Sequence, residues 1–257
     1  MTEGATIVAP PIRVVIIDTQ RLVVEMTRAV LQEAGNIVVG IAYRADEVVA
    51  LLRGPRADVA LVGYALPDGR GTDVIRRIRR AWPLCRAVLF TRFLDPLIVE
   101  EAIAAGADGV VRKGQGMAEL LDTVRRAAAG DVLLDPATLA GLARRAPALA
   151  LPTRVTLLSE RERDVLEVLL EEGGIDAAAL RLGITPSTYR VHLHHAMRKL
   201  GVDTRLAAIS HALHAGFIRA PAARTGAERA RPTGSARVVS VAIHAQDDAL
   251  KPVGDQG

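Results

Sequence analysis

The sequence is poor in cysteine, lysine and aromatic residues. Cys85 is the single cysteine among 257 residues, so the chain can form neither an internal disulfide nor a cysteine-based metal cluster. This excludes disulfide-stabilised scaffolds and zinc fingers. Lysine occurs three times, and the other basic residues are arginine, whose side chain titrates very high. The pI of about 9.7 therefore reflects a net charge of only +4 and is a weak argument for nucleic-acid binding.

Long apolar runs are also missing. No stretch could span a bilayer, and the N-terminus lacks a signal-peptide pattern, so we expect a cytoplasmic protein with no membrane partner. Hydrophobic residues make up 50% of the chain and charged residues 24%, which is enough apolar surface for a packed core. The length suits about two domains.

The first half alternates strand-like and helix-like segments. After a lead, 1–11, that we expect to be disordered, β-branched runs alternate with segments of helical spacing as far as Gly130. Short connections between such units predict a five-stranded parallel sheet with helices on both faces, a doubly wound α/β domain over 12–130. The expected strands are 12–17, 37–42, 57–62, 86–91 and 108–112, and the expected helices are 20–34, 44–53, 71–81, 96–106 and 115–129.

A linker and a small helical domain follow. Residues 131–156 predict a linker with one short helix from 135 to about 145, and 157–219 predict four helices. A short helix, a turn at Gly183 and a longer helix form a helix-turn-helix pattern. The tail, 220–257, is expected to be disordered, with one strand-like stretch at 237–245. The expected helices are 160–172 with a capping box from Ser159, 177–182 capped by Asp176, 186–200 capped by Thr185, and 205–215.

Basic residues gather in the second half of this helical segment, as a domain that contacts the DNA backbone requires. Five of the six histidines lie there too. His192 and His195 are one helical turn apart, but no cysteine or acidic residue accompanies them at ligand spacing, so we expect no metal site. The preferred interpretation is a polar helix surface beside phosphates.

Both halves resemble known families. Ser159–Leu166, Thr185–His192 and Met197–Val202 are similar to the LuxR-type helix-turn-helix. Ile12–Asp18, Leu66-Pro67 with Gly71, Thr91 and Ala105–Lys113 are similar to a response-regulator receiver. In this order they resemble the two-domain NarL/FixJ regulators. The resemblance implies an α/β plus all-α fold, in which a CheY-like (flavodoxin-like) receiver precedes a small four-helix DNA-binding domain.

The receiver departs from that family at its phosphorylation site. The resemblance implies a phospho-acceptor aspartate at the end of the third strand and a Mg²⁺ ion held by acids at the end of the first. Here the acceptor position is Gly63, and the acidic pair is reduced to Asp18 followed by Thr19. One carboxylate is a poor site for a hard cation, which prefers several oxygen ligands. We therefore expect no metal, no cofactor and no control by aspartyl phosphorylation.

Other receiver positions are partly retained. Thr91 and Lys113 remain, and Val110 replaces the aromatic residue that acts as a switch in the family. Two roles for this degenerate pocket stay open. Asp18 and Lys113 could pair directly and hold the pocket in one state, or the pocket could bind a small molecule or a protein partner.

The helix beginning at Pro186 is expected to enter the major groove of double-stranded DNA, with its N-terminal residues at base edges. Arg190 is the best candidate for bidentate contact with guanine. Tyr189 could instead pack against the preceding helix, and Arg198 and Lys199 could be either phosphate contacts or a solvated helix end. The residues predicted to contact DNA are Thr185, Ser187, Thr188, Tyr189, Arg190, His192, Arg198 and Lys199.

The family resemblance also implies a homodimer on paired half-sites. Leu206, Ile209 and Leu213 form a candidate dimer face on the last helix, with packing inside their own domain as the alternative. Two-fold symmetry would predict an inverted repeat in the DNA. RNA polymerase would be a further partner if the protein is an activator.

The sequence features bear on three classes of function. The leading hypothesis is a sequence-specific transcriptional regulator that acts independently of aspartyl phosphorylation. The alternative is a protein-interaction module whose degenerate receiver docks a partner while DNA binding is weak or partner-dependent. An enzyme is disfavoured because no G-x-G-x-x-G follows the first strand, no Walker A lysine motif exists, and Gly69–Gly71 reads as a plain loop.

Overall fold

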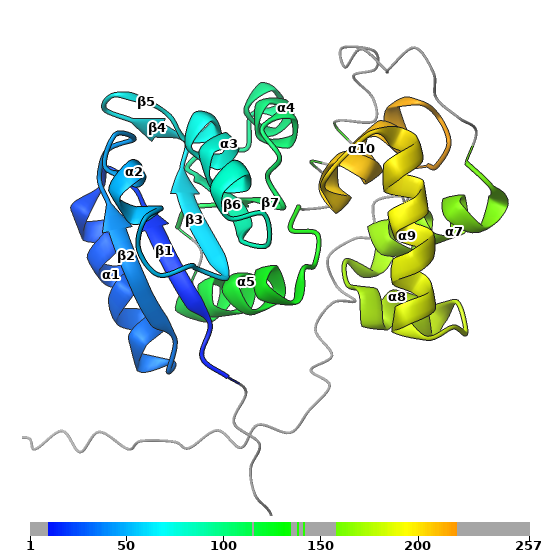
Figure 1. Cartoon of the computed structure of the whole chain (residues 1–257), viewed down its shortest axis with the longest axis horizontal. Coiled ribbons are helices and arrows are strands. Elements are labelled where there is room, and N and C mark those ends of the chain that lie inside the picture. Colours follow the sequence, from blue (N-terminus) through cyan, green and yellow to red (C-terminus); the bar gives the residue numbers. More distant parts are fainter. Residues whose placement is uncertain (1–9, 115, 135–137, 139–140, 142–157, 220–257) are drawn as a thin grey trace, which may run out of the picture. The chain divides into compact units, whose positions relative to one another are not determined.

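The computed structural model describes residues 10–114, 116–134, 138, 141 and 158–219, and Figure 1 labels its elements. These residues form an N-terminal α/β domain and a C-terminal helical domain. Most of the predicted lead, most of the predicted linker helix and all of the predicted tail lie outside the described residues. None of the described helices is long and apolar enough to cross a bilayer.

The α/β domain is built on five parallel strands, as the sequence predicts. They run in the order β2-β1-β3-β6-β7, so the chain starts at the second strand, adds β2 on one side and then adds β3, β6 and β7 on the other. In such a sheet the carboxyl ends of the strands on either side of the reversal point, here β1 and β3, border the functional crevice. The strands are β1 Arg13–Ile17, β2 Ile37–Ala42, β3 Val59–Gly63, β6 Arg86–Thr91 and β7 Gly109–Arg112.

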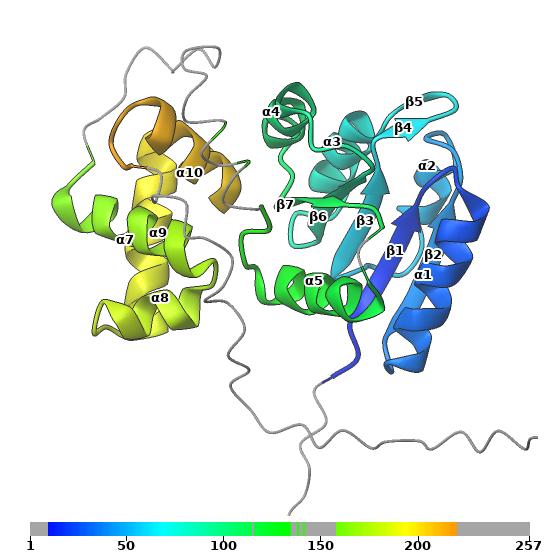
Figure 2. The same cartoon turned by 180° about the vertical axis from the view of Figure 1, so that it is seen from behind.

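Helices cover both faces of the sheet (Figures 1 and 2). Successive residues of a strand point to opposite faces, so Val14 and Ile16 pack under one helical layer and Val15 and Ile17 under the other. Burial on both faces is why these strands read as continuous β-branched runs. The first layer is α1 Arg21–Glu33 and α5 Met117–Ala129, and the second is α2 Val48–Leu51, α3 Gly71–Ala81 and α4 Pro96–Ala104.

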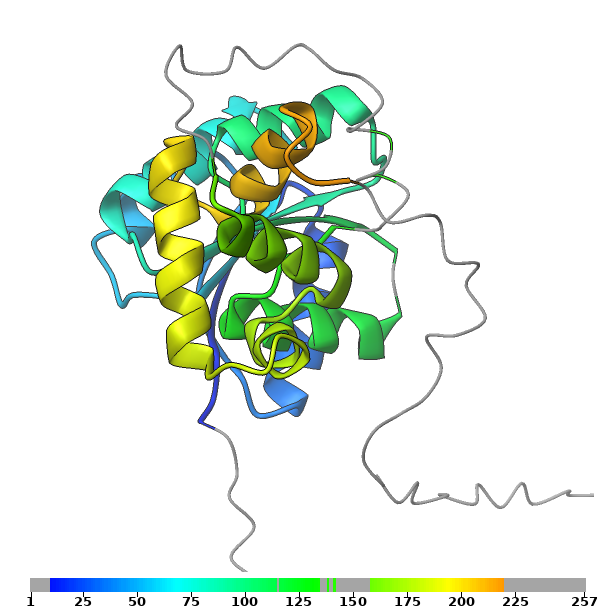
Figure 3. The same ribbon diagram turned by 90° about the vertical axis from the view of Figure 1, so that its right-hand side faces the viewer.

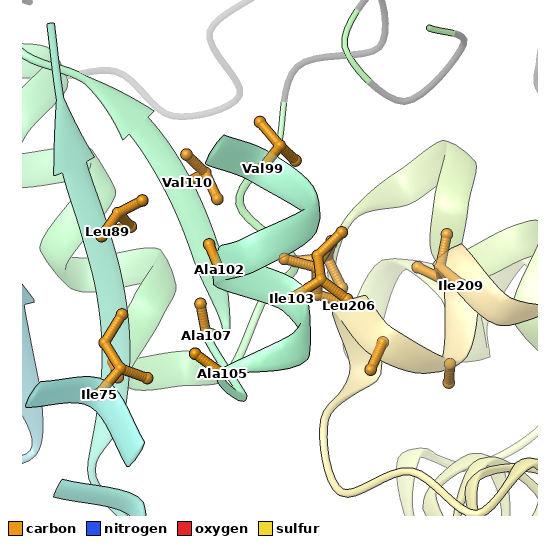
Figure 4. Close-up of a cluster of buried hydrophobic side chains, with 14 of the residues drawn as sticks. Ile75, Leu89, Val99, Ala102, Ile103, Ala105, Ala107, Val110, Leu206 and Ile209 are labelled. Carbon is orange, nitrogen blue, oxygen red and sulfur yellow. The ribbon is translucent and has the colours of Figure 1, made fainter. Parts of the chain in front are cut away.

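Helix α4 shows how local sequence and core packing agree. The Asp95 carboxylate accepts a hydrogen bond from the Leu97 amide at 2.8 Å, and Pro96 is the first helical residue, as the sequence predicts. The buried side chains Val99 and Ala102 of α4 lie over Val110 of β7 (Figure 4). This packing fixes the helix that follows the carboxyl end of β6.

Three local features differ from the sequence-based expectation. Helix α2 has four residues, whereas 44–53 was expected, because the Asp68 carboxylate accepts the amides of Ala45 (2.8 Å) and Asp46 (2.9 Å) and holds the preceding residues in turns. The expected loop at Gly69 belongs to a two-residue antiparallel hairpin, in which β4 Ala65–Leu66 pairs with β5 Gly69–Arg70. Leu133 pairs with Gly109 at the β7 edge, so the domain continues past residue 130.

The helical domain has the predicted four helices, with α9 as its long helix (yellow in Figure 3). Ser159 and Glu162 form the predicted capping box of α7, and Thr185 caps α9 through the Thr188 amide. The second helix is different, because it starts at Ile175 with Gly174 as its N-cap, so Asp176 lies in the first turn and caps nothing. The helices are α7 Glu160–Glu172, α8 Ile175–Arg181, α9 Pro186–Leu200 and α10 Arg205–His214.

A buried carboxylate ties the amino-terminal edge of the sheet to α3. Asp108 accepts hydrogen bonds from Arg79 Nη2 (2.9 Å), Arg86 Nη1 (3.2 Å) and the Ala87 amide (2.9 Å). Its side chain is 7% exposed and that of Arg79 is 16% exposed. A charge at this depth depends on its partners, because nothing else replaces its lost hydration.

We therefore expect Asp108→Ala to lower the free energy of unfolding of the α/β domain by about 3 kcal/mol, since it leaves two partly buried guanidinium groups, those of Arg79 and Arg86, without a counter-charge. Urea unfolding followed by the fluorescence of Trp82, the only tryptophan and a buried one, measures this domain directly. Asp73→Ala is the control, because it breaks only the surface pair with Arg76 and should cost less than about 0.5 kcal/mol. Equal costs for both variants would contradict a structural role for Asp108.

Candidate nucleic-acid interface and receiver pocket

The pocket at the carboxyl edge of the sheet contains a closed ion pair. Asp18 follows β1 directly and is buried, and Lys113 follows β7 directly. The Lys113 Nζ forms an ion pair with Asp18 Oδ2, and the Gln20 amide donates to Asp18 Oδ1 at 3.0 Å. The Lys113 side chain is only 12% exposed. Of the two roles left open by the sequence, the direct pairing of Asp18 with Lys113 is the one that this geometry displays.

Gly63, at the end of β3, lies beside this pair. A Cβ placed on Gly63 would lie 2.5 Å from Asp18 Oδ2 and 3.1 Å from Asp18 Cγ. Carbon and oxygen atoms do not approach so closely without a shift of one of them. The Asp18 carboxylate thus fills the space that a side chain at position 63 would need.

The remaining pocket residues do not offer a free reactive group. Thr91 is buried, and its Oγ1 donates to the Phe93 carbonyl at 3.2 Å within its own loop. The Lys113 amide donates to the Thr91 carbonyl, which fixes the two strand ends together. Val110 is buried under α4, and Thr19 is exposed. The structure therefore brings Asp18, Gly63 and Lys113 together and gives Thr91 and Val110 structural positions.

A second contact at this edge was missed by sequence reasoning. The Tyr64 hydroxyl donates to Glu101 Oε2 at 2.9 Å, and Arg70 Nη1 donates to Glu101 Oε1 at 2.9 Å. Burial, together with the Glu101 carboxylate, raises the pKa of Tyr64. This Tyr64–Glu101–Arg70 contact ties α4 to the residue after Gly63 and to β5. No local pattern signals it, because its members lie more than 30 residues apart or on a hairpin that the sequence does not predict.

In the helical domain, the start of α9 presents polar side chains to solvent. Ser187, Thr188 and Arg190 are exposed, and Thr185 Oγ1 lies 2.8 Å from Ser187 Oγ and 2.9 Å from Thr188 Oγ1. The Arg190 guanidinium is 3.8 Å from the exposed Asp176 carboxylate, a loose surface pair. Arg190 can therefore exchange this partner for another acceptor at little cost.

Two residues predicted to contact DNA are placed elsewhere. Tyr189 is fully buried, its hydroxyl donates to the Val165 carbonyl of α7, and burial raises its pKa. The prediction that Tyr189 faces DNA is therefore wrong, and the packing alternative holds. Lys199 is also engaged, because its Nζ is 2.7 Å from Glu162 Oε2. Lys199 thus contacts the start of α7 in this structure, and its predicted phosphate contact stays a prediction.

Glu162 shows why Lys199 is held there. Burial alone would raise the pKa of the Glu162 carboxyl, but hydrogen bonds from the Lys199 ammonium and from Ser159 outweigh it and lower the pKa below its ordinary value. The charged carboxylate and its ammonium partner thus stabilise the junction of α7 and α9.

The list of predicted DNA contacts leaves out three exposed residues of α9. Val191, His194 and His195 are exposed, Arg198 is exposed further along, and His192 is half-buried. His194 lies four residues after Arg190 and four before Arg198, so helical spacing alone would have placed it with them. The exposed part of α9 therefore continues well past its first turn.

The predicted dimer face of α10 is not free in this structure. Leu206 and Ile209 are completely buried and Leu213 is 6% exposed. All three side chains belong to a buried hydrophobic cluster. A dimer contact through these side chains would require them to become exposed. Dimerisation through α10 therefore stays a prediction.

The sequence matches two family models in the order of the two domains. Residues 14–125 match the response regulator receiver domain, and residues 156–212 match the bacterial regulatory proteins of the luxR family. The probable transcriptional regulatory protein NarL of Mycobacterium tuberculosis is 32% identical over 203 residues, which cover 79% of this chain and 94% of that protein. The chain belongs to the NarL/FixJ family of response regulators.

A second curated protein and a solved structure are also similar to this chain. The nitrate/nitrite response regulator protein NarL of Escherichia coli is 28% identical over 201 residues, 77% of this chain and 93% of that protein. The solved receiver domain of NarL from Mycobacterium tuberculosis is 29% identical, covers 47% of this chain and 98% of that one, and has a TM-score of 0.44. The protein is thus a DNA-binding transcriptional regulator of the NarL/LuxR type, with the predicted fold class: a CheY-like receiver followed by a LuxR-type helix-turn-helix domain.

The close approach of Gly63 to Asp18 makes a stability prediction. Gly63→Ala should lower the free energy of unfolding of the receiver by about 1–3 kcal/mol, because its methyl group must displace the Asp18 carboxylate from Lys113. In an Asp18→Ala background the same change should be nearly neutral, since the obstructing carboxylate is gone. Urea unfolding followed by Trp82 fluorescence measures the free energy of unfolding of the four proteins in this double-mutant cycle: the wild type, the two single variants and the double variant.

Gly69→Ala is the matched control, because its Cβ would meet Ala45 Cβ at an ordinary 3.6 Å. An equal cost of Gly63→Ala in both backgrounds would show that Asp18 does not fill the space beside position 63.

Proposed function

We propose that this protein is a sequence-specific transcriptional regulator whose DNA binding is independent of aspartyl phosphorylation, and that α9 is its recognition helix. The observation that supports phosphorylation independence is the closed pair of Asp18 and Lys113 beside Gly63. Glycine has no carboxylate to accept a phosphoryl group. The one nearby carboxylate, Asp18, already has both oxygens in contact with Lys113 and Gln20.

The same pair bears on the metal ion that phosphorylation would need. Mg²⁺ takes six oxygen ligands in near-ideal octahedral geometry and is usually held by one or two carboxylates together with phosphate oxygens. Here the carboxylate of Asp18 would have to give up a buried ammonium partner to bind the ion. Lys113, whose side chain is 12% exposed, would then be left without a counter-charge, which costs free energy. The ion pair between Asp18 and Lys113 therefore disfavours binding of Mg²⁺ by Asp18.

A receiver without a phosphoryl group needs another way to fix α4. The Tyr64–Glu101–Arg70 contact supplies one, because it fastens α4 to the chain next to Gly63 through two hydrogen bonds to a carboxylate. We infer that this contact, with Asp18 and Lys113, holds the receiver in a single state.

DNA reading by α9 rests on its exposed start. Ser187, Thr188 and Arg190 occupy the N-terminal turns, where a recognition helix meets base edges, and Pro186 fixes the first turn. Arg190 can make the bidentate contact to guanine O6 and N7. We propose Arg198 for phosphate contact, with the protein acting in the cytoplasm as a homodimer on an inverted repeat, and with RNA polymerase as partner if it activates.

Sequencing of genomic DNA fragments retained by the untreated full-length protein tests this proposal. We expect one inverted-repeat motif to be enriched, and we expect Arg190→Ala to reduce binding to it by at least about tenfold, the loss of one good base contact. Arg125→Ala is the control, because it removes the same charge from an exposed surface pair in the receiver.

If Arg190→Ala and Arg125→Ala enriched the motif equally well, Arg190 would not be a base-contacting residue. No enrichment by the untreated wild-type protein would overturn the proposal, because binding would then need a signal that the purified chain lacks.

A further inference from the structure

The exposed part of α9 carries two neighbouring imidazoles between two arginines. His194 and His195 are both exposed, and their ring centroids are 6.4 Å apart. Arg190 precedes His194 by four residues and Arg198 follows it by four, so the three side chains succeed one another along the helix surface. Exposed Val191 lies among them, one turn before His195. Neither imidazole is buried in the core of the helical domain.

We propose that His194 and His195 contact DNA phosphates as imidazolium cations, so that DNA binding by this protein takes up protons. The inference rests on the proposed role of α9 as the recognition helix. An imidazole ordinarily titrates near pH 6.5, and a nearby negative charge favours its protonated form. Bound DNA brings phosphates to this surface, and the affinity therefore rises as the pH falls toward 6.

Two carboxylates of neighbouring helices lie beside α9, and each has a cationic partner on α9. Glu162 of α7 holds Lys199, and Asp176 of α8 lies 3.8 Å from Arg190. Within the described part of the chain no carboxylate forms an ion pair with His194 or His195. The DNA is thus the counter-charge that these two imidazoles lack.

Helix α10 carries two more histidines, which lie outside α9. His214 Nδ1 lies 2.7 Å from the Ser210 carbonyl of its own helix. Burial and the neighbouring His214 lower the pKa of His211, so the fold favours its neutral form. The stability that His211 contributes is present above the unfolded pKa of about 6.5 and is lost as the pH falls through the lower folded pKa.

Fluorescence anisotropy of the full chain on a labelled duplex carrying the enriched motif tests the inference. We expect the wild-type Kd to fall by about tenfold between pH 7.5 and pH 6.0 at constant ionic strength, since each bound proton gives at most tenfold per pH unit. His194→Gln/His195→Gln, which keeps polar side chains but cannot become cationic there, should bind with a Kd that changes less than about twofold over this range.

His214→Gln is the matched control, a histidine lost from the same domain but outside α9, and it should keep the wild-type pH dependence. The two single variants should each keep part of it. Far-UV circular dichroism at both pH values checks that every variant is folded.

The outcomes separate the two proposals. A double variant with the full wild-type pH dependence, or a wild-type protein whose Kd does not change with pH, would overturn the role of His194 and His195 while leaving the proposed function intact. A wild-type protein that binds no duplex at any pH would overturn the proposed function and this inference with it.

Discussion

The ion pair between Asp18 and Lys113 determines what the receiver can do. A parallel sheet with the order β2-β1-β3-β6-β7 brings the ends of β1, β3 and β7 to one edge, where a receiver would place its acceptor, its metal ligands and its lysine. In this chain the same edge holds one carboxylate and one ammonium, and they are in contact beside a glycine. These two opposite charges neutralise each other.

The absence of a side chain at Gly63 and the position of Asp18 depend on each other. A larger residue at 63 would push the carboxylate away from Lys113, and a carboxylate elsewhere would leave a gap beside the glycine. Next to this pair, Glu101 fastens α4 to Tyr64 and Arg70. The receiver thus has the architecture of its family, with fixed contacts at the place where the family has a chemical switch.

The sequence predicts most of the fold because the relevant signals are local. Buried β-branched runs mark the strands, and Asp95-Pro96 and Thr185-Pro186 mark the helix starts. Local signals do not predict features that depend on contacts between residues far apart in the sequence. Asp68 shortens α2 from a hairpin more than 20 residues away in the sequence. The Val165 carbonyl accepts a hydrogen bond from the buried Tyr189 hydroxyl, and the Glu162 carboxylate pairs with the Lys199 ammonium. Which side of α9 faces the core is set by α7, so a list of its polar residues could not separate structural side chains from exposed ones such as His194.

The most direct test is the affinity of the full chain for its enriched duplex before and after incubation with a small-molecule phosphodonor and Mg²⁺. With Gly63 at the acceptor position and Asp18 held by Lys113, the Kd should stay the same within about twofold, and intact-mass analysis should find no added phosphoryl group. A tenfold change in Kd together with a phosphorylated receiver would contradict a closed, phosphorylation-independent pocket.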